Sequence, residues 1–331
     1  MKEMNFLNVV EREGKPVMEP GRMACPEIKE DEILVKIKAA AINRADLFQK
    51  SGKYPPPEGE SDVIGLEMAG EVMECGSKSS FYKKGARVFG LLPGGGYAEY
   101  CVIPETLAMP LPDSYTYEEG AAIPEVFLTA FQALILLGEL GEEEVVLVHA
   151  GASGVGSAAI QLAVQLAGAT VIATCGSPEK QEFCRSLGAD LAINYKTESF
   201  QEKIEERYGK NVVDLIVDVV GGPHWKQNMK VIAMDGRLIC LSTLGGSKIE
   251  EMSLIPVVKK RLTIKGSLLR NRSRKYKEKL THNFVGMCME LLESKKLKPA
   301  IDSVYHWDDV EEAHARMEAN LNAGKIVLNG M

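Results

Sequence analysis

The clearest pattern in the chain is a repeated change from short apolar runs to helix-like stretches, which begins at Glu144. Val145–Val148 is an apolar, β-branched run, typical of a strand that is buried on both faces. A short turn separates it from an almost entirely apolar helix pattern, Ala158–Ala167. Further strand patterns, with helix patterns between them, lie at Thr170–Thr174, Leu191–Asn194, Asp214–Val219, Arg237–Leu241 and Leu262–Lys265. Six strands with crossover helices predict a Rossmann fold, an α/β fold with a doubly wound parallel sheet.

The residues before this region follow a different pattern. Short alternating segments, broken by Gly and Pro, run from residue 1 to about 122 and predict a mostly β domain. Glu32–Ala39 alternates cleanly and is expected to form a half-buried strand. Asn43–Gln49 predicts a short helical turn, which is followed by Tyr54 and three prolines.

Two helices are expected to lead from this domain into the parallel sheet. A capping box of Thr116 and Glu119 predicts the first, and the mainly apolar Glu125–Gly138 predicts the second. After about Ser267 the pattern changes to helix, strand, helix and strand, at Tyr276–Ser294, Ser303–His306, Asp309–Asn320 and Lys325–Leu328. This tail is expected to return to the first domain. The expected domains are therefore residues 1–123 with 268–331, and residues 124–267.

Composition narrows the class of protein. The chain has 331 residues, 45% of them hydrophobic and 26% charged, as in ordinary globular proteins. Its net charge of −7 gives no general attraction to nucleic acid or to anionic membranes. We find no apolar run that could span a bilayer and no signal-peptide core, so a cytoplasmic protein without membrane association is expected. The seven dispersed cysteines include no CxxC pair and are expected to be reduced thiols.

The turn after Val148 has the composition of a phosphate-binding turn. Glycines between a strand and a helix let the backbone turn sharply and let a ligand approach closely. The N-terminus of the helix offers free N–H groups and the positive end of the helix dipole. We therefore expect the pyrophosphate of a dinucleotide to bind at Gly151, Ser153, Gly154, Val155 and Gly156.

The end of the second strand indicates which dinucleotide binds. NAD-binding sites usually carry an acidic residue there for the ribose hydroxyls, but this chain has Thr174, Cys175, Gly176 and Ser177. A phosphate on the ribose would find a hydroxyl, free N–H groups and a cation nearby, which favours NADPH. The residues expected to bind it are Gly176, Ser177, Lys180 and Tyr195. The alternative is that Ser177 only caps a helix, Lys180 is a solvated charge and Tyr195 packs on an edge.

Other residues follow strands of the same sheet, where cofactor is expected to pass. They are Gly221, Gly222, Leu244, Gly245, Leu268 and Leu269, with Thr129 on the helix before the sheet. The five histidines show no metal-binding spacing, and no GxSxG elbow surrounds a serine, so no metal site or serine nucleophile is predicted. His149, at the end of an apolar strand, is expected to be a hydrogen-bonded core residue.

Several motifs in one order along the chain carry a family resemblance. They are Asn43–Leu47, Tyr54–Pro57, Gly65–Glu67, Leu92–Gly96, Ala121–Glu125, Leu128–Gln132, the glycine turn, Asn194–Lys196 and Gly324–Val327. Together they resemble the zinc-free quinone oxidoreductase (zeta-crystallin-like) branch of the medium-chain dehydrogenase/reductase superfamily. The resemblance implies a GroES-like catalytic domain made from both chain ends, a Rossmann domain between them, and an active-site cleft at their junction. It also implies that Lys325 approaches the cofactor.

The resemblance implies that the chemistry needs no zinc. Zinc-dependent relatives have Cys where this chain has Asn43 and His where it has Leu66. Hydride from NADPH would reduce a quinone, with Asn43 and Tyr54 as hydrogen-bonding catalytic residues. The structural alternative is that Asn43 closes a turn and Tyr54 packs on the prolines.

Two other functions stay open at this stage. The same cofactor could reduce an enone or an enoyl thioester. A local basic cluster within residues 259–279 could instead bind nucleic acid, although the acidic chain makes this the weaker alternative. The last Rossmann strand, Leu262–Lys265, is expected to be a sheet edge. The family resemblance implies dimerisation through this region, so a homodimer is expected.

Overall fold

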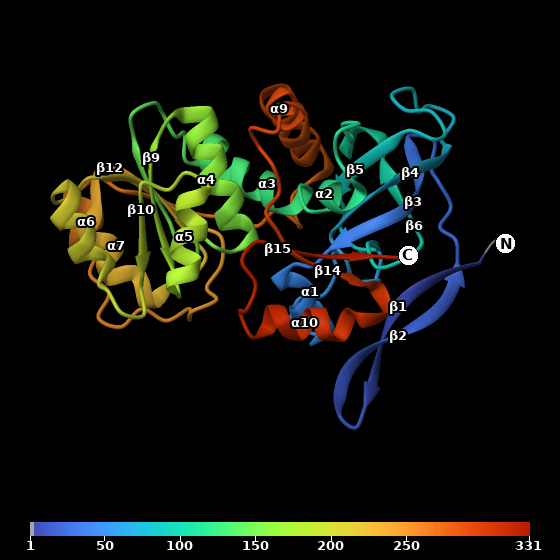
Figure 1. The fold of residues 1–331 in the computed structure, drawn as a ribbon, viewed down its shortest axis with the longest axis horizontal. Coiled ribbons are helices and arrows are strands. Elements are labelled where there is room, and N and C mark those ends of the chain that lie inside the picture. The colour runs from blue at the N-terminus through green and yellow to red at the C-terminus, as the bar shows by residue number, and fades with distance from the viewer. Residues whose placement is uncertain (1–2) are drawn as a thin grey trace. The chain divides into compact units, whose positions relative to one another are not determined.

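A computed structural model of the chain describes residues 3–331. The chain forms two compact units (Figure 1). The first unit contains the residues up to Leu128 together with Arg270–Met331, and the second unit is Thr129–Leu269. This division falls a few residues from the boundaries expected from the sequence.

The second unit is built on a parallel sheet of six strands in the order β10-β9-β8-β11-β12-β13. This confirms the predicted doubly wound sheet. Chain order reverses between β8 and β11, the neighbouring strands at which ligands bind in such sheets. The strands are β8 (Val145–Val148), β9 (Thr170–Cys175), β10 (Leu191–Asn194), β11 (Val213–Asp218), β12 (Ile232–Cys240) and β13 (Thr263–Gly266).

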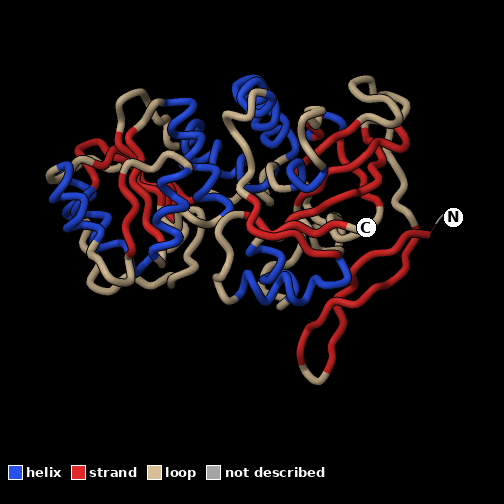
Figure 2. Tube along the Cα trace, viewed as in Figure 1, coloured by secondary structure: helices blue, strands red, loops and turns tan. Residues whose placement is uncertain are grey.

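Helices lie on both faces of this sheet (Figures 1 and 2). Aliphatic residues of the strands, such as Leu147 and Ile216, pack against Phe200 and Ile204 and form one buried core. Burying each such side chain contributes about 1.5–3 kcal/mol. The helices are α4 (Gly154–Ala167), α5 (Pro178–Ser186), α6 (Phe200–Tyr208), η3 (Gly222–His224), α7 (Trp225–Val231) and α8 (Ile255–Lys259).

The helix predicted over Glu125–Gly138 is not one continuous α-helix. It is α-helical over Pro124–Phe131 (α3) and becomes a wider π-helix over Gln132–Leu137 (η2). The amide of Gly138 accordingly donates to the carbonyl of Ala133, five residues earlier. A π-turn adds one residue per turn without changing the apolar composition, so the sequence pattern did not reveal it.

The first unit has a mixed sheet in the order β14-β15-β3-β4-β5-β7, and β6 pairs with β3. Its pairings are antiparallel, except that β14 and β15 are parallel. The strands are β3 (Glu32–Ala41), β4 (Glu67–Cys75), β5 (Arg87–Leu91), β6 (Tyr100–Pro104), β7 (Ala108–Pro110), β14 (Ile301–His306) and β15 (Lys325–Asn329). β15 pairs with β3, so this part of the C-terminal tail belongs to the sheet of the first unit.

Helices and short helical turns complete the first unit. They are α1 (Arg44–Lys50), η1 (Glu105–Leu107), α2 (Tyr117–Ala121), α9 (Arg274–Glu293), η4 (Trp307–Asp309) and α10 (Val310–Glu318). The predicted capping box is present at the start of α2, where Thr116 Oγ1 accepts from the amide of Glu119 and Glu119 Oε2 accepts from the amide of Thr116. Among the described residues, no helix has both the length and the apolar character needed to cross a bilayer.

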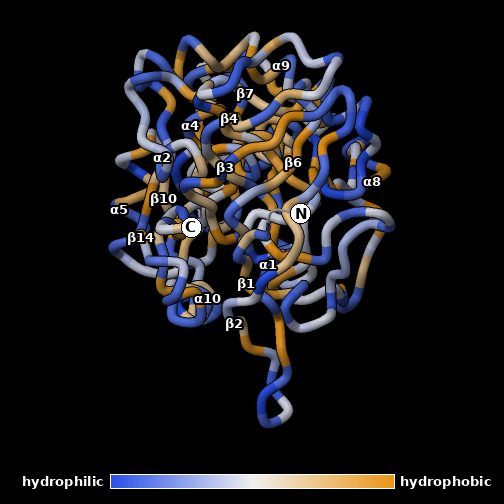
Figure 3. The backbone as a smooth tube through the Cα atoms, turned by 90° about the vertical axis from the view of Figure 1, so that its right-hand side faces the viewer, coloured by the Kyte–Doolittle hydropathy of each residue, from blue (hydrophilic) through white to orange (hydrophobic). Residues whose placement is uncertain are grey.

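A hairpin of β1 (Glu3–Arg12) and β2 (Lys15–Ala24) was not predicted from the sequence. Its alternation is interrupted by Pro16, Pro20 and Gly21, and much of both strands is exposed. Figure 3 shows that its tip is hydrophilic. The hairpin lacks the regular apolar face on which recognition of a strand pattern depends.

Candidate active-site and cofactor residues

Asn43 lies between β3 and α1 in the first unit and is 8% exposed. Its Nδ2 donates to Glu67 Oε1 (2.8 Å) and to the Ala41 carbonyl (3.3 Å). Its Oδ1 accepts from Lys325 Nζ (2.7 Å). The carboxamide is therefore bonded at both ends within the unit, and Asn43 does occupy the N-cap position of a helix. A contact between Asn43 and substrate stays a prediction.

Lys325 and Glu67 form a buried ion pair beside Asn43. The distance between Nζ and Oε1 is 2.7 Å, and the side chains are 3% and 0% exposed. Lys325 Nζ also donates to the carbonyl of Ile42 (2.8 Å) and to Asn43 Oδ1. An ammonium has three hydrogens, so these three acceptors satisfy it. The contact of Lys325 with cofactor, implied by the family resemblance, stays a prediction and would require one of these bonds to be exchanged.

Tyr54 is held in place by Arg270, a residue that is 7% exposed. The guanidinium carbon lies 5.1 Å from the centre of the Tyr54 ring, and Nη1 donates to the Tyr54 carbonyl (3.4 Å). Arg270 also donates to the carbonyl of Pro93 (2.8 Å) and to Gln49 Oε1 (2.7 Å). Partial burial raises the pKa of Tyr54, so its hydroxyl is protonated at neutral pH and can donate a hydrogen bond.

A second set of buried polar side chains includes Asp46 of α1. Asp46 Oδ2 accepts from the amide of Asn43 (2.7 Å) and from the Tyr97 hydroxyl (3.2 Å), and that hydroxyl is 3.2 Å from His314 Nε2. Burial raises the pKa of Asp46 to about 7 and lowers the pKa of His314 to about 3. Within residues 3–331, Asp46 Oδ1 and His314 Nδ1 are buried polar atoms without a hydrogen-bond partner.

In the second unit, the predicted phosphate-binding turn follows β8. Ser153 caps α4, and its side-chain oxygen accepts from the amide of Gly156 (3.0 Å). A Cβ atom on Gly156 would lie 2.3 Å from the carbonyl oxygen of Ala150, and one on Gly151 would lie 2.8 Å from Ala173 Cβ. Only glycine permits these close approaches. Gly154 and Val155 are the first residues of α4, so the predicted residues do form one turn at a helix N-terminus.

The residues expected to select the cofactor lie close together. Ser177 caps α5, where its Oγ accepts from the amide of Lys180 (3.3 Å). A Cβ atom on Gly176 would lie 3.3 Å from the Tyr195 hydroxyl and 3.3 Å from Lys196 Cε. Tyr195 is 45% exposed. Gly176 thus borders a space that has a hydroxyl and a lysine side chain beside it, with a capped helix N-terminus next in sequence.

The remaining predicted residues of the sheet follow its later strands. Gly222 N–H donates to the Gly246 carbonyl (2.9 Å), and Gly245 N–H donates to the Val220 carbonyl (2.9 Å). The loops after β11 and β12 are therefore bonded to each other. Because all six strands are parallel, these loops lie at the same edge of the sheet as the Gly151 turn and Gly176. Gly221 and Leu244 belong to these loops, Leu268 and Leu269 follow β13, and Thr129 lies in α3.

Three residues at these positions have roles that were not proposed from the sequence. Glu67 and Arg270 hold the two candidate catalytic residues, and Lys196 adjoins Gly176. The sequence placed Arg270 in the basic cluster and after the last Rossmann strand, where cofactor is expected to pass, but not beside Tyr54. Glu67 and Lys196 belong to motifs of the family resemblance, but the contacts of all three residues depend on the fold.

A parallel sheet with a glycine turn, inserted into a β-rich unit made from both chain ends, defines a class of dinucleotide-binding oxidoreductases. The alcohol dehydrogenase GroES-like domain family matches residues 29–113, and the zinc-binding dehydrogenase family matches residues 154–286. The chain belongs to the medium-chain dehydrogenase/reductase superfamily and is an oxidoreductase.

Several relatives that match over most of their length carry the name quinone oxidoreductase. The chain is 31% identical to the quinone oxidoreductase-like protein 2 homolog of Nematostella vectensis, over 96% of this chain and 86% of the relative. It is 28% identical to the quinone oxidoreductase of Homo sapiens, over 99% and 98% of the two chains. A mycobacterial protein, whose structure is described as complexed with NADPH, matches with a TM-score of 0.86 and 26% identity, over 99% and 100% of the two chains.

Proposed function

We propose that this protein is an NADPH-dependent, zinc-independent quinone oxidoreductase. The observation that carries the proposal is the arrangement around Gly176, where the Tyr195 hydroxyl and Lys196 adjoin the Ser177-capped start of α5. A hydroxyl, a cation and a helix N-terminus suit a ribose phosphate, and no carboxylate stands at the end of β9 to favour unphosphorylated ribose. Full-length relatives named quinone oxidoreductase support the choice of acceptor.

The second unit carries the residues proposed to bind the nucleotide. Gly151 and Gly156 let the turn pack closely against its own backbone and against Ala173, and the N-terminus of α4 follows directly. The N–H groups at this helix end suit a pyrophosphate. When bound, the nicotinamide supplies the hydride. The chain's own task is to fix the dinucleotide at the strand ends and to present hydrogen-bond donors to the acceptor oxygen that gains negative charge.

In the first unit, Tyr54 and Asn43 are the proposed donors to that oxygen. The hydroxyl of Tyr54 is protonated at neutral pH, and Arg270 fixes the backbone and the ring of this residue. Asn43 is held by Glu67 and Lys325, so one of its present bonds would have to be exchanged for a bond to substrate. A reduced quinone oxygen is a stabilised anion, so hydrogen bonds can replace a metal ion here.

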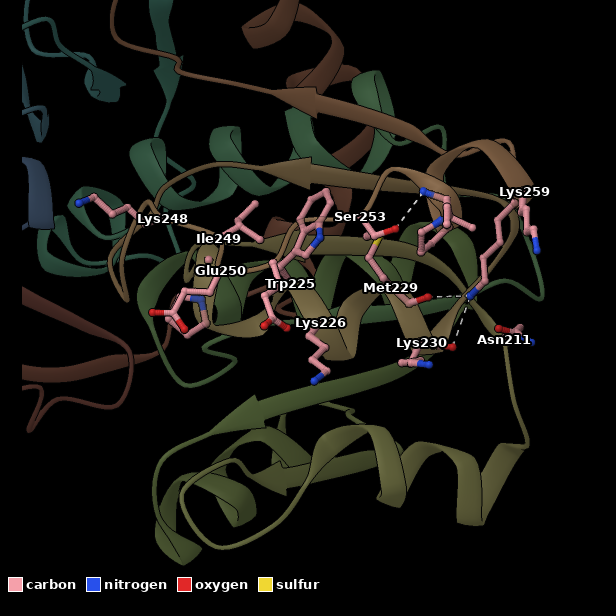
Figure 4. A pocket seen from close by; sticks show the side chains of 16 residues that line it. Asn211, Trp225, Lys226, Met229, Lys230, Lys248, Ile249, Glu250, Ser253 and Lys259 are labelled. Carbon is pink, nitrogen blue, oxygen red and sulfur yellow. Dashed lines mark hydrogen bonds between the residues drawn. The ribbon is translucent and has the colours of Figure 1, made fainter.

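The contacts of the basic cluster support an enzyme rather than a nucleic-acid-binding module. Lys260 Nζ donates to the carbonyls of Met229 (2.8 Å) and Ile232 (2.6 Å), close to the C-terminal end of α7. Arg261 pairs with Asp235, and Arg274 pairs with Asp31 and Glu278. Lys260 also lines a pocket of about 780 Å³, shown in Figure 4, whose other lining residues include both lysines and glutamates. Charges already engaged in this way are less suited to binding phosphates.

We also propose a homodimer formed through β13, in a cytoplasmic protein. β13 ends the strand order of its sheet, so one side of it lacks a strand partner within the described unit. Ile264 on β13 is 40% exposed. A lysine at this edge would oppose strand pairing, so Ile264→Lys should convert the dimer to a monomer. Light scattering measures this change. The control Val304→Lys, in the first unit, should leave the dimer intact. A dimer unaffected by Ile264→Lys would contradict this interface.

The proposed activity is tested by a turnover panel. Quinones, enones, enoyl thioesters and aldehydes are offered with NADPH and with NADH, before and after dialysis against a chelator. We expect quinone reduction with NADPH preferred and no loss on chelation. Faster reduction of an enone or enoyl thioester would favour the alternative reductase. Activity that only zinc restores, in metal-free protein that is still folded by circular dichroism, would refute zinc independence of the chemistry.

A further inference from the structure

A buried cluster of potential metal ligands lies at the ends of two central strands in the second unit. His149 follows β8, Asp218 ends β11, and His224 lies in η3 just beyond it. They are 1%, 3% and 8% exposed. Each offers one ligand atom, and these three atoms all lie within 4.8 Å of one another. No ligand spacing in the sequence suggested a metal site, because His149 is far from the other two residues in the chain.

Hydrogen bonds within the cluster define which nitrogen of His149 carries a lone pair. Asn228 Nδ2 donates to Asp218 Oδ2 (3.2 Å), so Asn228 Oδ1 is the acceptor that faces His149 Nε2 (2.8 Å). His149 therefore donates through Nε2, as a hydrogen-bonded core histidine, and Nδ1 is the unprotonated nitrogen, which accepts from the Thr174 hydroxyl (2.9 Å). Metal-binding histidines are commonly oriented in this way, by donation from the other ring nitrogen to a neighbouring oxygen.

The unprotonated nitrogen faces the second imidazole. The distance between His149 Nδ1 and His224 Nδ1 is 3.2 Å. Two nitrogens bound to one tetrahedral zinc ion, each at about 2.0–2.1 Å, lie roughly 3.3 Å apart. The ring of Phe200 packs edge-on against both imidazoles, with centroid distances of 5.1 and 5.2 Å, and keeps this side of the cluster apolar.

We propose that His149, His224 and Asp218 bind a divalent transition-metal ion of the zinc class. Two imidazole nitrogens and a carboxylate oxygen are a donor set that zinc and cobalt(II) accept. Binding requires the Thr174 hydroxyl to release His149 Nδ1 and His224 to carry its proton on Nε2. It also requires the Asp218 carboxylate to turn toward the imidazoles and to give up its bond from Asn228. Asp218 Oδ1 now accepts from the amides of Val220 (2.6 Å) and Gly221 (3.0 Å), so the ion would link β8 and β11 to the Gly221 turn.

The test uses the full chain, freed of metal with a chelator and titrated with cobalt(II) and zinc. We expect one ion per chain, the visible absorption of tetrahedral cobalt(II) without a thiolate band, and a higher thermal midpoint with zinc. His224→Gln and Asp218→Asn should each abolish this binding, and Asn228→Ala should weaken it about 10–100-fold because it removes the partner of His149. The control His282→Gln changes an exposed histidine of α9 and should bind as the parent does.

Three results would overturn the proposal. They are the absence of stoichiometric binding, binding that survives His224→Gln, and a cobalt spectrum with thiolate character. Circular dichroism of each metal-free variant shows whether it folds. His224 is the most exposed of the three ligands, so His224→Gln should fold even where Asp218→Asn does not.

Discussion

From the buried carboxyl of Asp46 we predict quantitatively how the stability of the first unit depends on pH. Its carboxyl is 0% exposed, and burial raises its pKa to about 7, against the opposing effects of the Asn43 amide and Lys325. In the unfolded chain the pKa is close to its usual 3.8. A pKa raised on folding means that the native state holds the proton more tightly, so the stabilisation is fully present below pH 3.8 and is lost as pH rises through about 7.

The size of the effect follows from the two pKa values. Each unit of difference corresponds to about 1.4 kcal/mol, so ionisation of Asp46 removes about 4 kcal/mol from the free energy of unfolding between about pH 4 and pH 8. Asp46→Asn keeps the shape and removes the titration. The variant should therefore gain stability relative to the parent as pH rises, by about 3 kcal/mol between about pH 5 and pH 8.

The assay is urea unfolding followed by tryptophan fluorescence in a Trp225→Phe background. The chain has two tryptophans, so Trp307, which is 8% exposed in the first unit, then reports on that unit alone. Asp302→Asn is the control, because the pKa of Asp302 is lowered, by Arg316 among other partners, and its effect should be constant over this pH range. If the difference between Asp46→Asn and the parent is also constant with pH, Asp46 does not titrate as argued here.

Two further predictions concern the proposed site. Lys196→Ala should lower kcat/KM for NADPH about tenfold, a loss of about 1.4 kcal/mol, and leave kcat/KM for NADH unchanged. Lys210→Ala, which changes an exposed lysine, is the control. Equal losses with both cofactors would contradict a contact between Lys196 and the ribose phosphate. Arg270→Lys should reduce kcat with little change in the KM for NADPH and destabilise the first unit by about 3 kcal/mol in urea unfolding. The three acceptors, the Pro93 and Tyr54 carbonyls and Gln49, each face a different nitrogen of the guanidinium, and a single lysine nitrogen cannot reach all three positions. Arg272→Lys should do neither, and an unchanged kcat would remove Arg270 as the residue that positions Tyr54.

The sequence predicted those parts of the molecule that depend on local order. The strand Val145–Val148, the glycine turn and α4 are consecutive, and each has a physical signature within a few residues, so the Rossmann sheet could be predicted in detail. The Ser177 cap of α5 was predicted for the same reason. The irregular hairpin β1–β2 was missed because its alternation is broken by proline and glycine.

Contacts between distant residues could not be obtained in this way. Glu67 and Lys325 are 258 positions apart, and neither stands in a pattern that requires a partner. The hydrogen bonds that join His149, Asn228 and Asp218 likewise require β8 and β11 to be neighbours. This neighbourhood follows from the order of strands in the sheet and cannot be read from either segment. Sequence indicated that Asn43 and His149 were polar residues at the ends of buried segments, but the fold determines what each one binds.

The Glu67–Lys325 pair also explains why the proposed chemistry needs no zinc at Asn43. The ammonium of Lys325 lies 2.7 Å from both Asn43 Oδ1 and Glu67 Oε1 and supplies the positive charge that the buried carboxylate requires. A metal ion bound through Asn43 would have to displace this ammonium and leave it buried without its carboxylate, at a cost of several kcal/mol. Leu66, the other position that holds a ligand in zinc-dependent relatives, has no donor atom to offset that loss. On the proposal that the chemistry is zinc-independent, the covalently attached ammonium of Lys325 would therefore take the place that a metal ion at Asn43 would need.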